Sequence, residues 1–320
     1  MQAPTLDDIR AAAKRIAGVA VGTPLLRSEA LGAVVGMPAF VKAECLQRGG
    51  AFKIRGAYNK IASLSAGERA RGVLAYSSGN HAIAVATAAK LFGIPAVIVM
   101  PADAPRAKLE RARALGAEVV TYDRISESRE AVSAALEQER NLPVVRPFDD
   151  PLIMAGQGTV GLEIAEDLAA LGLGDAVVVS PASGGGLAGG VATALDGVAR
   201  VFAVEPEEHN DLQRSVAAGE IVSNAPGVRS ICDALMVQHP SALTLAVARA
   251  KLAGALTVSD DEVRRAMRFG FDELKLVIEP GGAAGLAAAL HGRAPKGGAL
   301  VVIASGGNVD AEMFASVLRG

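Results

Sequence analysis

The stretch VVVSPASGGGLAGG, residues 177–190, is a short apolar run followed by a loop rich in glycine. Uninterrupted apolar runs, rather than alternating ones, are typical of strands that are buried on both faces of a parallel sheet. Further runs, each followed by a helical pattern, lie at residues 39–43, 73–76, 96–100, 118–122, 201–204 and 300–304. This alternation predicts an α/β fold with two open, mostly parallel sheets covered by helices.

The chain has 320 residues, a length typical of about two domains. Residues 72–147 read as a compact set of strand–helix units between two segments that carry other glycine-rich loops. We therefore expect a small domain of residues 72–147 inserted into a large domain of residues 1–71 and 148–320. Capping-box spacing at Thr5 and Asp8 and at Ser259 and Glu262 predicts two helix starts.

The composition excludes several classes of protein. The 32 basic and 34 acidic residues give a net charge of −2, which is not the footprint of a nucleic-acid or anionic-membrane binder. Cys45 and Cys232 are far apart and predict neither a disulfide framework nor a zinc cluster. The first residues lack signal-peptide order, and the longest apolar stretch, residues 91–102, is interrupted by Gly93 and Pro95. We expect a soluble, cytoplasmic protein that acts on a small neutral or zwitterionic molecule.

The loop GGAFKIRG, residues 49–56, contains a lysine between two bulky apolar residues, close to glycines. Desolvation there favours a neutral Lys53 amine, the form that Schiff-base chemistry requires. The alternative, which is more common for a lysine, is a solvated residue at the start of a helix.

Two further loops follow apolar strands. In YSSGNH, residues 76–81, the N–H groups at a helix start form an anion site for a carboxylate, although Ser78 or Asn80 in an ordinary N-cap gives the same pattern. In ASGGN, residues 304–308, Ser305 is expected at the carboxyl edge of a sheet, where open α/β sheets bind ligands. A simple turn rich in Gly and Asn is the alternative.

The glycine-rich loop at residues 183–190 matches GxGxxG from Gly184 to Gly189, with Glu205 about 20 residues on. This match raises a nicotinamide-dependent dehydrogenase as an alternative function. Physically, consecutive glycines indicate only a cradle of N–H groups for a phosphate. A lysine, an anion pocket, a phosphate cradle and a hydroxyl at a ring edge are together what a phosphorylated aldehyde cofactor needs, whereas hydride transfer has no need of the lysine.

With these motifs, the sequence resembles the fold-type II pyridoxal-phosphate enzymes, in the branch of serine racemase and of serine and threonine dehydratases. The resemblance extends from TPL at residues 23–25 to SGGNVD at residues 305–310. Its most specific motifs are AFKIRGA at residues 51–57, SSGNH at 77–81, AGQGT at 155–159 and the loops at Ser183 and Ser305.

The resemblance implies a role for each matching position. Lys53 is expected to hold pyridoxal 5'-phosphate as a Schiff base, with Phe52 packed against the ring. Asn80 is expected at the ring hydroxyl and Ser305 at the ring nitrogen. The phosphate is expected on the backbone N–H groups of Ser183, Gly184, Gly185, Gly186 and Leu187.

For the substrate, the resemblance implies a carboxylate site made of Ser77, Ser78, Gly79, Asn80 and His81. Lys53 is expected to remove the Cα proton as general base, and Ser78 matches the acid–base residue that racemases use on the opposite ring face. The implied reaction is conversion of L-serine or L-threonine to a 2-oxo acid and ammonia, with some serine racemisation.

An alternative substrate is 3-hydroxyaspartate, whose second carboxylate needs a cation. Arg129 is a candidate, although a solvated helix arginine explains it equally well. Ile83 replaces a glutamine that is common in relatives, which weakens any expectation of nucleotide activation.

The family also implies a divalent-metal site and a homodimer. EPEEHND, residues 205–211, resembles the metal site, with Glu205, Asp211 and the carbonyl of His209 as ligands. Carboxylates and a carbonyl suit magnesium or calcium. A solvated acidic turn is the alternative.

Overall fold

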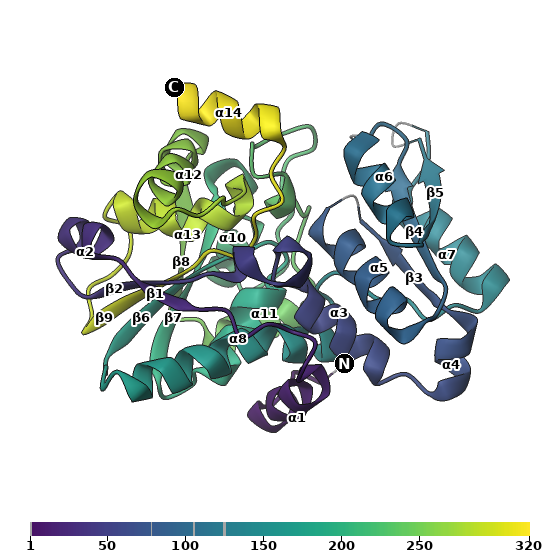
Figure 1. Ribbon diagram of the computed structural model, residues 1–320, viewed down its shortest axis with the longest axis horizontal. Coiled ribbons are helices and arrows are strands. Elements are labelled where there is room, and N and C mark those ends of the chain that lie inside the picture. Colours follow the sequence, from purple (N-terminus) through teal and green to yellow (C-terminus); the bar gives the residue numbers. More distant parts are fainter. Residues whose placement is uncertain (1, 78, 105, 124–125) are drawn as a thin grey trace.

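The computed structural model describes residues 2–77, 79–104, 106–123 and 126–320. It contains a six-stranded sheet of order β1-β2-β9-β6-β7-β8 and a three-stranded sheet of order β3-β4-β5 (Figure 1). All strand pairs are parallel except β1 with β2. The strands are β1 Leu25–Arg27, β2 Ala39–Lys42, β3 Val73–Tyr76, β4 Ala96–Pro101, β5 Glu118–Tyr122, β6 Ala176–Pro181, β7 Ala199–Pro206, β8 Gly254–Val258 and β9 Ala299–Ile303.

Helices precede, connect and follow these strands. The α-helices are α1 Leu6–Ile16, α2 Glu29–Val35, α3 Lys53–Ala62, α4 Ala66–Arg71, α5 Asn80–Phe92, α6 Arg106–Ala114, α7 Arg129–Arg140, α8 Pro151–Ala170, α9 Gly186–Ala194, α10 Asp211–Ala218, α11 Ala242–Lys251, α12 Asp260–Leu274, α13 Pro280–Leu290 and α14 Ala311–Arg319. Short 3-10 helices are η1 Glu44–Leu46, η2 Arg48–Gly50, η3 Glu207–His209 and η4 Asp233–Leu235.

The six-stranded sheet is covered on both faces, because successive side chains of a strand point to opposite faces. Val177 and Val179 of β6 belong to a core shared with α2, α12 and α13. Val178, between them, belongs to a second core shared with α8 and α9. This arrangement explains why the central strands are uninterrupted apolar runs.

The three-stranded sheet has its own core and lies beside the larger sheet, with α3 between the two (Figure 1). One face packs against α5, α6 and the Ile54, Ala57 and Ile61 side chains of α3. The other face packs against α7. Because α3 also contacts α8, its first residue, Lys53, lies at the junction of the two sheets. The domain boundaries at residues 72 and 147 remain a prediction.

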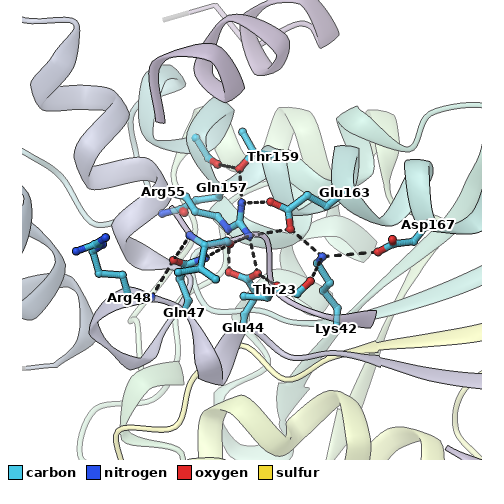
Figure 2. A network of polar contacts seen from close by, with 12 residues as sticks. Thr23, Lys42, Glu44, Gln47, Arg48, Arg55, Gln157, Thr159, Glu163 and Asp167 are labelled. Carbon is cyan, nitrogen blue, oxygen red and sulfur yellow. Dashed lines mark hydrogen bonds and ion pairs between the residues drawn. The ribbon is translucent and has the colours of Figure 1, made fainter. Parts of the chain in front are cut away.

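A buried ion-pair network fixes α3 to the larger sheet (Figure 2). The Arg55 guanidinium donates to Glu44 at 2.8 Å and to Glu163 of α8 at 2.6 Å. Buried Lys42 of β2 also contacts Glu163, at 2.7 Å. Burial disfavours the charged guanidinium, but the neighbouring Glu44 carboxylate raises the pKa of Arg55 above its usual range. The charges therefore hold the helix that carries Lys53 in one position.

The predicted fold class is confirmed, and the predicted strands all occur, with ends that differ by at most two residues. Both predicted capping boxes are present. The predictions omitted β1 and β8, which lie at the two edges of the larger sheet and are mostly half-buried rather than fully apolar. Among the described helices, none is long and apolar enough to cross a membrane.

Candidate active site

Lys53 is the first residue of α3, and its side chain points toward the segment that precedes α8. The Nζ atom donates a hydrogen bond of 2.7 Å to the carbonyl of Pro147 and lies 5.1 Å from the centroid of the Phe52 ring. Burial lowers the pKa of Lys53 to about 8. About a tenth of this amine is therefore neutral at pH 7, compared with less than about a thousandth of an ordinary lysine, and the neutral form is the one that nucleophilic and general-base chemistry requires.

The Ser305 loop is hydrogen bonded to the Lys53 loop. The Phe52 N–H donates to the Ser305 carbonyl at 3.1 Å, and the Gly307 N–H donates to the Gly50 carbonyl at 2.8 Å. Gly50 has a φ of +80°, and a Cβ there would lie 2.5 Å from the Asn308 side chain, so only glycine fits. These bonds hold buried Ser305 beside the lysine.

Asn80, the first residue of α5, is oriented by two side chains that sequence reasoning missed as site residues. Its Nδ2 donates to Glu279 at 2.5 Å, and its Oδ1 accepts from Asn308 at 2.7 Å. Burial raises the pKa of Glu279 to about 7, and the hydrogen bond from Asn80 opposes this rise. With these bonds fixed, the second N–H of the Asn80 amide remains as a donor for a ligand.

The glycine loop between β6 and α9 has the shape of an anion cradle. Gly184 and Gly185 have φ values of +65° and +85°, and α9 begins at Gly186. A Cβ on Gly184 would lie 2.8 Å from the Phe148 ring, which is why this position has no side chain. The first N–H groups of α9 have no partner within the helix, which is the arrangement that binds a phosphate at a helix start.

His81 lies in the first turn of α5 and is buried. Its Nε2 lies 2.7 Å from the Val145 carbonyl, which only accepts, so Nε2 carries the proton. Burial and, to a smaller extent, the positive charge of Lys53 lower the pKa of His81 to about 3. The ring is therefore neutral, and its Nδ1 is buried without a hydrogen-bond partner among the described residues.

The rest of the predicted carboxylate loop is only partly described. The Ser77 hydroxyl accepts from the Gly79 N–H at 3.2 Å, as in an ordinary turn. Ser78, predicted to be the acid–base residue on the second ring face, lies outside the described residues.

Residues 145–148 form a wall of the site that sequence reasoning missed. The Val145 carbonyl binds His81, the Pro147 carbonyl binds Lys53, and the Phe148 ring lies against the glycine cradle. This segment carries no recognisable motif, because it acts through backbone carbonyls that any residue supplies.

Arg129, the predicted cation for a second carboxylate, begins α7 near the site. Its guanidinium lies 5.2 Å from the centroid of the Tyr76 ring, one residue before Ser77. It also pairs with Glu130 at 2.5 Å, and 45% of its side chain is exposed. The arginine is thus beside the expected carboxylate loop and accessible from solvent.

Glu205 and Asp211, the predicted metal ligands, are buried close together. The Glu205 carboxylate accepts from the N–H groups of Leu212 and Gln213 at 3.1 and 2.8 Å. Burial and the neighbouring Asp211 raise the pKa of Glu205 to about 8. One oxygen of Asp211, Oδ2, is buried without a hydrogen-bond partner among the described residues. Two buried carboxylates, one with an oxygen that has no hydrogen-bond partner among the described residues, suit a hard cation.

His209, whose carbonyl was the third predicted ligand, is the last residue of η3. Within the described part of the chain, no group of three or more His, Cys, Asp and Glu side chains is close enough to hold a metal ion. The predicted metal ligands do not include three such side chains, since they are two carboxylates and a backbone carbonyl.

Comparisons with known proteins cover nearly the whole chain. A family model described as "Pyridoxal-phosphate dependent enzyme" matches residues 16–306. The chain is 42% identical over 324 residues to an L-threo-3-hydroxyaspartate ammonia-lyase from a Pseudomonas species, with 100% of both chains covered. It is 39% identical over 318 residues to an L-threonine ammonia-lyase from Thermotoga maritima, with 98% of this chain and 78% of the relative covered. Maize serine racemase superposes with a TM-score of 0.92 at 39% identity, with 99% of this chain and 98% of that chain covered.

Proposed function

The chain belongs to the family of pyridoxal-phosphate-dependent enzymes, and on that premise we propose that it is an ammonia-lyase for β-hydroxy amino acids, with some racemase activity on serine. The reaction converts the amino acid to a 2-oxo acid and ammonia. The observation that carries the proposal is the Lys53 amine, whose pKa burial lowers to about 8, at the junction of the two sheets.

The residues present fit pyridoxal phosphate. The start of α9 offers N–H groups to the phosphate, Asn80 has one N–H left for the ring hydroxyl, and Ser305 lies beside the lysine. When bound, this cofactor forms a covalent bond to an amine and withdraws electrons from the amino-acid Cα. We assign its attachment to Lys53.

This chain's own residues then supply binding and proton transfer. The N–H groups at the start of α5 hold the substrate carboxylate and orient the Cα–H bond toward Lys53 Nζ. The Lys53 amine, once free, takes the Cα proton on its face of the ring. We assign the opposite face to Ser78, which carries the proposed racemisation.

Two substrate types fit this chemistry. L-Serine and L-threonine need only the carboxylate loop and a β-hydroxyl, and a relative is an L-threonine ammonia-lyase. L-threo-3-Hydroxyaspartate needs a further cation, for which Arg129 lies beside Tyr76, and a relative is an ammonia-lyase for that compound. The Arg129 side chain favours L-threo-3-hydroxyaspartate over L-serine and L-threonine as the substrate.

The dehydrogenase alternative loses its basis. The glycine-rich loop that suggested it lies within residues 16–306, which match the family of pyridoxal-phosphate-dependent enzymes. We instead assign Glu205, Asp211 and the His209 carbonyl to magnesium or calcium. A homodimer and a cytoplasmic location complete the proposal.

The test is product analysis with purified holoenzyme. Ammonia and a 2-oxo acid should form from L-threo-3-hydroxyaspartate, L-serine or L-threonine, and D-serine should form from L-serine. Borohydride should fix the cofactor on Lys53, as peptide mass spectrometry would reveal. Absence of ammonia from all three amino acids, with the cofactor attached to Lys53, would refute the lyase activity.

A further inference from the structure

Arg146 lies beside Tyr76 because residues 143–145 run alongside β3. The Leu74 N–H donates to the Pro143 carbonyl at 3.0 Å, and the Val145 N–H donates to the Leu74 carbonyl at 2.8 Å. This pairing is parallel and sets Val144 opposite Leu74. Arg146 follows Val144 by two residues, as Tyr76 follows Leu74, so Arg146 lies near Tyr76, and its charge acts on the Tyr76 phenol.

The backbone around Arg146 is part of the active-site wall. The carbonyl of the residue before it binds His81 at 2.7 Å, and the carbonyl of the residue after it binds Lys53 Nζ at 2.7 Å. Arg146 is therefore fixed between the carboxylate loop and the lysine, and a movement of its Cα would disturb both.

The Arg146 guanidinium is weakly engaged. Within the described residues it makes no hydrogen bond, and its ion pair, with Asp149, is long at 3.7 Å. Its side chain is 48% exposed, so the pair with Asp149 is screened by water. Burial raises the pKa of Tyr76, and the charges of Arg146 and Arg129 oppose this rise, in agreement with two guanidinium groups near one phenol ring.

We propose that Arg146 is a specificity-determining residue that, together with Arg129, binds the second carboxylate of an acidic β-hydroxy amino acid. The inference rests on the proposed lyase function and selects a dicarboxylic substrate within it. Arg129 lies over the Tyr76 ring, and Arg146 lies near the same residue, two positions after Val144, which pairs with Leu74. Tyr76 leads directly into the loop that is expected to bind the first carboxylate.

Two arginines suit this task better than one. A guanidinium binds a carboxylate through two parallel N–H donors, and the donors of Arg146 are not used by the described residues. Glu130 and Asp149 balance the two charges in the absence of a ligand. Because exposed pairs of this kind are weak, a substrate carboxylate displaces them at little cost.

The direct test is binding of succinate, which has the two carboxylates of 3-hydroxyaspartate but neither its amine nor its hydroxyl. Calorimetry on the holoenzyme should give an affinity for succinate that falls about tenfold to hundredfold in Arg146→Gln, as expected when a charge-assisted hydrogen-bonded pair is lost. Propionate, with one carboxylate, should be affected much less. The affinity of Arg146→Lys for succinate should be intermediate, because lysine keeps the positive charge but lacks the two parallel N–H donors of a guanidinium.

The matched control is Arg140→Gln. Arg140 is also an arginine near the three-stranded sheet and pairs with Glu118 at 2.8 Å, but it lies at the far end of α7. This variant should bind succinate like the parent protein. An equal affinity for succinate in Arg146→Gln and Arg140→Gln would overturn the proposal.

Kinetics separate this inference from the lyase proposal. In Arg146→Gln, the kcat/KM for L-threo-3-hydroxyaspartate relative to that for L-serine should fall about tenfold or more. If the parent enzyme releases ammonia but this ratio is the same in both proteins, the role of Arg146 is refuted and the lyase function stands. If no amino acid reacts, the lyase function is refuted, and the succinate titration still decides the role of Arg146.

Discussion

At the scale of single residues, burial shifts three titratable groups toward their neutral forms. It lowers the pKa of Lys53 to about 8 and that of His81 to about 3, and it raises the pKa of Glu279 to about 7. The shifts share one cause, since removal from water penalises the charged form of each group. The site thus holds a lysine that reacts as an amine and a histidine that binds without carrying a charge.

The Lys53 shift predicts the pH dependence of cofactor attachment. The neutral amine is the nucleophile, so the rate at which apoprotein attaches pyridoxal phosphate should rise with pH and level off above a midpoint of about 8. An ordinary lysine would give a midpoint more than two units higher. Stopped-flow absorbance measures this rate, with Lys53→Ala as the control that forms no covalent bond. A midpoint near 10 would show that the amine is solvated.

A second residue-scale prediction concerns Ser78, assigned to the opposite face of the ring. Ser78→Ala should lower the rate of racemisation by a factor of about 10² to 10⁴. The rate of elimination from the enantiomer whose Cα proton points toward Ser78 should fall by the same factor. Elimination from the other enantiomer should persist, because Lys53 still removes its proton. Kinetics with L- and D-serine decide this. Equal, small losses on both enantiomers would indicate a helix cap and a single base.

At the scale of elements, α3 is the helix whose position decides where Lys53 lies. Its apolar side faces the smaller sheet, while Arg55, two residues after Lys53, is bound to Glu44 of η1 and to Glu163 of α8, which packs against the larger sheet. Thr23 also donates to Glu44, at 2.5 Å. The helix is therefore fixed on one side by apolar packing and on the other by the buried charges that Figure 2 shows.

This account predicts a large effect of Arg55→Met. Removal of the guanidinium leaves buried Glu44 without its cation, which should lower the free energy of unfolding by about 3–5 kcal/mol. The double variant Arg55→Met with Glu44→Met should recover much of that loss, since Glu44 no longer leaves a buried carboxylate without its cation. Urea denaturation measures both, and Arg140→Gln is the control for a surface pair. Additive losses in the double variant would contradict the coupling.

The elements also show how much of the structure could be predicted from a single sequence. The central strands and the four loops after them were predictable, because buried strands are apolar and close approach to a ligand requires glycine or small polar residues. Glu279 and the carbonyls of Val145 and Pro147 were not. Each reaches the site through contacts with segments about 65 to 200 residues away in the chain, and nothing in the local sequence of these residues distinguishes them from a surface acid or a turn.

At the scale of the whole molecule, the site is complete only where the two sheets meet. Lys108 of α6 pairs with Asp233 of η4 at 2.6 Å, and Arg111 of α6 donates to Asn308 at 2.7 Å. Asn80 of α5 reaches across to α13 through Glu279. The expected carboxylate loop belongs to one side and the expected phosphate cradle to the other, so these contacts determine the distance between the two binding sites.

The larger sheet also carries the proposed cation site, at the end of β7. Glu205 is the penultimate residue of β7 and Asp211 the first residue of α10. A cation there connects the strand to the helix. Leu212, the next residue of α10, packs against Gly185 of the phosphate cradle, so the site lies close behind the cofactor position.

The metal proposal predicts a stability that depends on the ion. A ligand that binds only the native state stabilises it by about 2.7 kcal/mol at a hundredfold excess over its Kd. Protein that has been freed of metal with a chelator should therefore unfold at a higher temperature when magnesium or calcium is added, and activity should rise in parallel. Glu205→Gln removes a ligand charge and should abolish this response. Glu207→Gln, which changes an acidic residue of the same turn outside the predicted ligand set, should retain it. An equal response to the ion in both variants, or no response in the parent protein, would show that residues 205–211 form a buried acidic turn that binds no metal.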